Sequence, residues 1–147
     1  MSQSYVLDTS SLLNLLRGKK LGELIDRTFG LRAAPYMHTL SIVTHAELWV
    51  LIERNGWGEE RKATVEKALQ EFVTIDVSGS QIVSAYRRVE AASVGITMGK
   101  NDIWIAATAM ITGLPLITTD KDFNHLNGKL LEVHYVDPMS VTGPIVS

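Results

Sequence analysis

Short apolar runs alternate with amphipathic stretches along nearly the whole chain, and this alternation limits the possible folds more than any other feature. Five runs have the character of buried strands, and they span residues 5–7, 37–43, 73–77, 114–119 and 130–136. The stretches between them have helical spacing, and they span residues 10–18, 19–30, 44–56, 59–72, 81–95, 101–113 and 121–128. Strands that alternate with helices predict a mainly parallel sheet with helices on both faces. We therefore expect an α/β fold of three layers, α/β/α.

The length and composition are those of one soluble domain. With 147 residues the chain fits a single core, so we assign residues 1–137 to one domain and residues 138–147 to a C-terminal tail. No apolar run is long enough to span a membrane, and the N-terminus lacks the pattern of a signal peptide. We therefore expect a cytoplasmic protein without a membrane partner.

Charge and cysteine content narrow the possible kinds of site. The chain contains no cysteine, which excludes disulfides and thiolate metal sites. Its net charge of −2 provides no general attraction for nucleic acids. Any contact with a nucleic acid must therefore depend on local lysines and arginines.

Four acidic residues occupy positions where a surface charge is not expected. Asp8 and Asp120 each follow a strand of the predicted sheet, whose carboxyl edge is the usual place for a ligand crevice in α/β folds. Glu47 and Asp102 lie in helices whose other residues are mostly apolar. Because a buried, unpaired carboxylate is costly, such groups are normally paired or bind a metal.

Each acid also has a simpler explanation when it is taken alone. Asp8 and Asp102 would serve as helix caps, Asp120 as a turn residue and Glu47 as the polar edge of a helix. Pairing with a cation is a further alternative, for which Arg54, Lys100 and Lys121 are near in sequence. Four acids in such positions, in a chain with 16, favour a shared site over four separate explanations.

A group of carboxylates without cysteine or paired histidine ligands suits a hard divalent cation, Mg²⁺ or Mn²⁺. Crowded carboxylates repel one another unless a cation neutralises them. One or two bound ions would activate a water and stabilise the leaving oxygen of a phosphodiester. Asp122 is near enough to Asp120 to compete for a ligand role, but we assign it an outer position because Asp120 directly follows the strand.

Three segments together resemble the PIN domain family, and in particular its VapC-type toxin ribonucleases. The segments are YVLDTSSLL at residues 5–13, SIVTHAELWVLIERNG at 41–56 and NDIWIAATAMITGLPLITTDKDF at 101–123, and the resemblance extends from Tyr5 to Val136. It implies a PIN-like fold and a catalytic, metal-binding role for Asp8, Glu47, Asp102 and Asp120. It also implies that polar side chains beside these acids support them, and Thr9, Ser10 and Asn101 occupy those positions.

The resemblance further implies an Mg²⁺- or Mn²⁺-dependent endoribonuclease, the toxin of a VapBC-type toxin–antitoxin pair. The expected partners are an RNA substrate, a cognate antitoxin protein and a second copy of the chain. Two alternatives stay open at this point. One is a stand-alone RNA-processing PIN nuclease, and the other is a PIN-like module that binds RNA without turnover.

Overall fold

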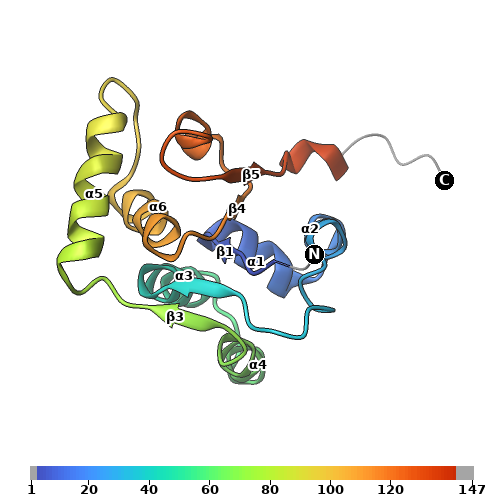
Figure 1. The fold of residues 1–147 in the computed structure, drawn as a ribbon. Coiled ribbons are helices and arrows are strands. Elements are labelled where there is room, and N and C mark those ends of the chain that lie inside the picture. Colours follow the sequence, from blue (N-terminus) through green and yellow to red (C-terminus); the bar gives the residue numbers. More distant parts are fainter. Residues whose placement is uncertain (1–2, 142–147) are drawn as a thin grey trace.

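Five parallel strands form one sheet at the centre of the protein (Figure 1). The computed structural model describes residues 3–141. The strands are β1 (Val6–Leu7), β2 (Thr39–Ser41), β3 (Val73–Ile75), β4 (Leu116–Thr118) and β5 (Val133–Tyr135), and they are ordered β3-β2-β1-β4-β5. All four pairings are parallel. The predicted three-layer α/β/α class is confirmed.

Helices connect the strands as the sequence predicts. They are α1 (Thr9–Arg17), α2 (Lys20–Phe29), α3 (Ile42–Arg54), α4 (Glu59–Leu69), α5 (Ser80–Ala92), α6 (Lys100–Thr112) and the short 3-10 helices η1 (Lys121–Leu126) and η2 (Pro138–Val141). The strand expected over residues 37–43 is shorter, because Ser41 already caps α3. Its hydroxyl accepts the N–H of Val43 at 3.1 Å.

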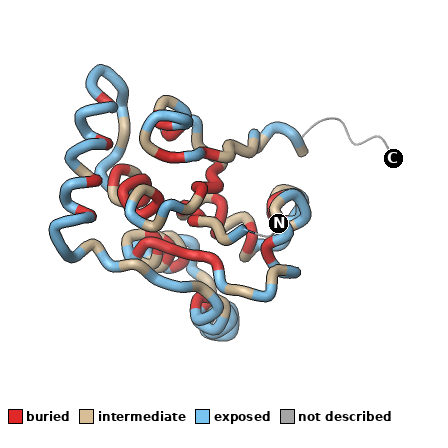
Figure 2. Tube along the Cα trace, viewed as in Figure 1, coloured by how far each residue is buried: buried red, intermediate tan, exposed pale blue. Residues whose placement is uncertain are grey.

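The alternation of side chains along the strands separates two apolar layers. Val6 and Leu116 pack on the side of α6, whereas Leu7 and Ile117 pack against the helices α1 to α4. All four side chains are completely buried, and Figure 2 shows the buried trace concentrated in the sheet and the inner helix faces. Helix α5 lies outermost and packs mainly on α6 (Figure 1).

The strand order creates a switch point between β1 and β4. The chain starts in the middle of the sheet, builds β2 and β3 on one side, and then crosses over to build β4 and β5 on the other side. In open α/β sheets the ligand crevice lies at this point, beyond the carboxyl ends of the strands. Asp8 and Asp120 follow the two strands that flank it.

The C-terminal region predicted as a tail is described only in part. Pro138–Val141 form η2, which lies against α2, and residues 142–147 lie outside the described residues. The proposed boundary at residue 137 therefore stays a prediction. Within residues 3–141 no helix combines the length and apolarity that a membrane crossing requires.

Helices α1 and α2 approach each other closely at Gly22, and this contact generates a test of the packing. A Cβ atom on Gly22 would lie 2.1 Å from the carbonyl oxygen of Asn14, so the two helix backbones must separate to admit it. We expect Gly22→Ala to lower the free energy of unfolding by about 1–3 kcal/mol, as overpacking does. Chemical denaturation measures the change. Gly58→Ala is the control, because a Cβ there has open space, and equal losses in both variants would contradict the packing argument.

Candidate active site

Asp8 stands at the end of β1 and caps α1, and it is only 3% exposed. Its Oδ1 accepts the N–H of Ser11 at 2.9 Å and the Ser11 hydroxyl at 2.8 Å. Its Oδ2 accepts the hydroxyl of Thr118 at 2.5 Å, and Ser10 Oγ lies 3.0 Å from both oxygens. Burial raises the pKa of Asp8 above its ordinary value, and these hydrogen bonds oppose the shift. The explanation of Asp8 as a helix cap is therefore correct, and it does not exclude a place in the site.

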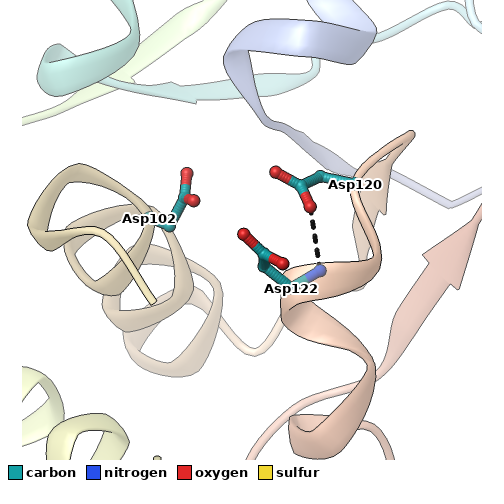
Figure 3. A group of neighbouring side chains, drawn as sticks. All are labelled: Asp102, Asp120 and Asp122. Atoms are coloured by element: carbon teal, nitrogen blue, oxygen red, sulfur yellow. Dashed lines mark hydrogen bonds between the residues drawn. The ribbon is translucent and has the colours of Figure 1, made fainter. Parts of the chain in front are cut away.

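Asp120 follows β4 and begins η1. Its Oδ1 accepts the N–H of Asp122 at 2.9 Å, so the local turn directs both side chains toward the start of α6 (Figure 3). The backbone N–H of Asp120 donates to Thr118 Oγ1 at 2.9 Å. Thr118 thus connects Asp120 to Asp8 across the switch point.

Asp102 lies in the first turn of α6, opposite the two acids of η1 (Figure 3). Gly99 is the residue that caps this helix, so the explanation of Asp102 as a cap is wrong. Oxygen atoms of Asp102, Asp120 and Asp122 all lie within 4.8 Å of one another. Asp122 therefore lies closer to Asp102 and Asp120 than we expected from the outer position that the sequence predicted for it.

The pKa of Asp102 is raised to about 7. Burial is the largest cause, and repulsion by the charges of Asp120, Asp8, Glu47 and Asp122 adds to it. The charges of all four other acids therefore act on Asp102. These acids lie in α3 and η1 and in the turns that follow β1 and β4. The sequence-predicted acids Asp8, Glu47, Asp102 and Asp120 converge on this one place.

Glu47 joins the site from α3 and is held by two neighbouring residues. Its Oε1 accepts the hydroxyl of Thr9 at 2.6 Å, and its Oε2 accepts the side-chain amide of Asn101 at 3.2 Å. Thr9, Ser10 and Asn101 thus each hydrogen-bond to an acid of the site. Glu47 and Asp8 lie outside the tight group of three, and their charges act on it from its edge.

Two hydroxyl residues of the site were not identified from the sequence. Ser11 and Thr118 both donate to Asp8, and Thr118 lies 110 positions away from it. The sequence gives two signs of these residues. Ser11 belongs to the hydroxyl-rich run that follows Asp8, and Thr118 belongs to the pair of threonines before Asp120. The register that pairs Leu7 with Ile117 brings Thr118 next to Asp8.

The five acids have no basic partners among the residues that the structure describes. The ion pairs found in residues 3–141 are Lys62–Glu59 and His134–Glu132, so the predicted alternative of pairing with Arg54, Lys100 or Lys121 is wrong. The donor set consists of carboxylate oxygens, which suits Mg²⁺ or Mn²⁺. The arrangement can therefore hold a hard divalent cation at an open edge of the sheet.

Comparison with known proteins gives consistent results. The sequence model of the family described as PIN domain matches residues 5–129. Ribonuclease VapC5 of Mycobacterium tuberculosis (strain ATCC 25618 / H37Rv) is 33% identical over 127 residues, which cover 84% of this chain and 87% of that protein.

Solved structures of similar fold include two from toxin–antitoxin systems. VapBC-5 of Mycobacterium tuberculosis matches with a TM-score of 0.64 and 30% identity, over 91% of this chain and 99% of the other. VapBC2 of Rickettsia felis, bound to a DNA fragment from its promoter, matches with a TM-score of 0.72 over 90% and 98% of the two chains. Its identity is 20%, so this second likeness concerns the fold.

The burial of Asp102 and its crowding by other acids predict that the metal-free protein loses stability as the pH rises. Because the folded-state pKa of Asp102 is about 7 and its ordinary value is 3.8, the folded state retains a proton that the unfolded chain has lost between these values. Stability therefore falls from about pH 4 to pH 7. Asp102→Asn removes this penalty, so in EDTA we expect the variant to melt at a higher temperature than the wild type at pH 8, with a smaller difference at pH 5.

Differential scanning calorimetry at the two pH values measures this effect. Glu53→Gln, which neutralises an exposed acid on α3 outside the cluster, is the control. A difference between Asp102→Asn and the wild type that is the same at both pH values would contradict the raised pKa of Asp102.

Proposed function

The chain belongs to the PIN domain family, and from this premise we propose that it is a metal-dependent endoribonuclease and the toxin of a VapBC-type toxin–antitoxin pair. The observation that carries the proposal is the convergence of five acids at the switch point without basic partners among residues 3–141. The relative named Ribonuclease VapC5 supports the activity and the choice of RNA as substrate. The structures of VapBC systems support the toxin role.

We propose that Asp102, Asp120 and Asp122 hold a divalent cation, Mg²⁺ or Mn²⁺, with Asp8 and Glu47 at the edge of the same field. When bound, such an ion supplies Lewis-acid charge that stabilises a phosphodiester under attack and makes a water more acidic. Thr118, Ser10 and Ser11 fix Asp8, and Thr9 and Asn101 fix Glu47. These hydrogen bonds hold the carboxylates in position before substrate arrives.

The chain's own groups then determine the outcome of the reaction. A carboxylate of the cluster orients the attacking water in line with the phosphorus and the leaving oxygen. Because water is the nucleophile, the 2′-hydroxyl of the RNA takes no part in the attack. When the bond between the phosphorus and the 3′-oxygen breaks, that oxygen takes up a proton, and the products carry a 5′-phosphate and a 3′-hydroxyl.

We propose an antitoxin as the second partner. A hollow of about 830 Å³ lies between the end of α1, the α2–β2 connection and α4, with Leu15, Leu16, Leu31 and Phe72 among its apolar lining residues. An amphipathic helix of an antitoxin would bury its apolar face here. An arginine of the same protein would pair its guanidinium with two carboxylates of the acid site and so compete with the metal.

The proposed homodimer has a self-complementary surface on α5. Val83, Arg87, Glu90 and Val94 share one exposed face of this helix and the turn after it, and Val94 is 83% exposed. A two-fold axis midway between positions 87 and 90 places Val83 opposite Val94 of the partner subunit and Arg87 opposite Glu90 of the partner subunit. Such pairing of one patch with itself is the usual form of a dimer interface.

The first test measures cell growth and RNA cleavage. We expect expression of the wild-type chain to arrest growth and the purified protein to cleave single-stranded RNA in Mg²⁺ or Mn²⁺, with 5′-phosphate and 3′-hydroxyl ends seen by mass spectrometry. Asp8→Asn and Asp102→Asn should each lower cleavage by at least about 100-fold, the order of loss on removal of one electrostatic group from an active site. Neither variant should arrest growth, and circular dichroism checks that both are folded.

Two kinds of result would contradict different parts of this proposal. Full cleavage in EDTA, or products with 2′,3′-cyclic phosphate ends, would overturn the metal-dependent mechanism. A wild-type chain that cleaves RNA and is harmless at high expression would overturn the toxin role alone, and would favour a stand-alone RNA-processing nuclease.

The second test concerns the dimer. We expect Arg87→Glu and Glu90→Arg each to weaken self-association by about tenfold or more, because like charges then face each other across the two-fold axis. The double variant should recover dimer formation, because the opposite charges are restored in exchanged positions. Sedimentation velocity gives the dissociation constants, and a wild-type mass of one chain at micromolar concentration would refute the dimer.

A further inference from the structure

The three acids that lie closest together belong to two separate segments of the chain. Asp102 lies in the first turn of α6, whereas Asp120 and Asp122 lie at the start of η1 (Figure 3). Within residues 3–141 no side-chain hydrogen bond connects Asp102 with either of the other two acids. Because their charges repel, other residues must set the distance between the start of α6 and η1.

A histidine and a buried serine bridge these two segments. His125, three residues after Asp122, has its Nε2 atom 2.8 Å from the hydroxyl oxygen of Ser93. Ser93 is the C-cap of α5 and is 8% exposed. Its hydroxyl also lies 3.6 Å from the sulfur of Met98, which directly precedes Gly99, the residue that caps α6. The bridge therefore leads from η1 to the start of the helix that carries Asp102.

The direction of this hydrogen bond follows from the other partner of the serine. A hydroxyl has a single proton, and the Ser93 hydroxyl donates it to the carbonyl oxygen of Val89 at 2.8 Å. Nε2 of His125 therefore donates its N–H to Ser93 Oγ. What the bridge requires of residue 125 is a hydrogen-bond donor, which glutamine can supply and leucine cannot.

Apolar packing also holds η1, but it fixes the position of this segment less exactly. Phe123 and Leu126 are completely buried in the same apolar layer as Ile103 of α6. Such contacts are non-directional, whereas a hydrogen bond weakens steeply when its distance or angle changes. In the part of the chain that the structure describes, the bond between His125 and Ser93 is the only hydrogen bond between η1 and the segment from α5 through α6.

We propose that His125 and Ser93 are positioning residues of the metal site. Their hydrogen bond holds η1 close to the start of α6 against the repulsion of the charges, so that Asp102, Asp120 and Asp122 together bind one divalent cation. Small displacements matter, because Mg²⁺ requires near-octahedral ligands at about 2.0–2.1 Å. The inference rests on the proposed metal site, and it adds two residues outside the group of acids that determine how tightly the ion binds.

The experiment measures the affinity for Mn²⁺ in the absence of RNA, from the electron paramagnetic resonance signal of the free ion. His125→Leu and Ser93→Ala remove the bond from its two sides, and His125→Gln retains a donor. His134→Leu is the matched control, because His134 is also half-buried and makes one side-chain hydrogen bond of 2.8 Å, to Glu132. Chemical denaturation in EDTA gives the stability of every variant.

We expect His125→Leu and Ser93→Ala each to raise the Kd for Mn²⁺ by about tenfold, the lower end of the range for residues that orient metal ligands. The double variant should lose no more affinity than either single variant, because both substitutions remove the same bond. His125→Gln should regain most of the affinity, and His134→Leu should bind Mn²⁺ as the wild type does. A role in stability alone would not produce this pattern, because Kd is measured on the folded protein.

The remaining outcomes separate this inference from the proposed function. If the wild type, His125→Leu and Ser93→Ala bind Mn²⁺ equally well, the inference is overturned and the metal site stands. If His125→Gln binds as weakly as His125→Leu, or His134→Leu loses as much affinity, the hydrogen bond is not the cause and the inference is likewise overturned. If the wild type binds no Mn²⁺, the proposed metal site fails, and this inference fails with it.

Discussion

Asp8 is almost completely buried at the end of the central strand, and a carboxylate in such a place is costly unless hydrogen bonds stabilise its charge. The chain supplies those bonds from both sides of the switch point. Ser10 and Ser11 donate from α1, and Thr118 donates from β4 while it accepts the N–H of Asp120. Because these bonds join the start of α1 and the end of β4 to one carboxylate, they also hold Asp8 close to Asp120.

The acids are held together by helix ends rather than by basic side chains. Asp8 caps α1, Asp102 lies in the first turn of α6, and Asp120 caps η1. The unpaired N–H groups at a helix start stabilise negative charge, although they offset only part of the repulsion. Burial and the repulsion that remains together raise the pKa of Asp102. A site built in this way keeps carboxylate oxygens free for a cation, whereas lysine or arginine partners would occupy them.

The sequence carried most of the fold and the principal acids, because both depend on local patterns. The periods of the apolar residues predicted every strand and every helix except η2, and Asp8 and Asp120 were recognised by the strands that precede them. The support of Asp8 by Thr118 depends on strand register, which local periodicity does not encode. Asp122 was placed too far out, because the tight turn in which Asp120 accepts its N–H brings it back toward Asp102. Capping and site formation were weighed as alternatives, but Asp8 both caps α1 and lies near enough for its charge to act on Asp102.

The length of α1 determines how an inhibitor of this site would have to be built. The hollow assigned to the antitoxin includes Met37 and His38, which precede β2, whereas Asp8 lies beyond the opposite, carboxyl edge of the sheet. Helix α1 connects the two places, because Leu16 near its end lines the hollow and Asp8 caps its start. Its nine residues measure ~13 Å. A segment that leaves the hollow in extended form needs about four residues to cover that length. An antitoxin that both anchors in the hollow and blocks the acids therefore requires a short extended stretch between its helix and its arginine.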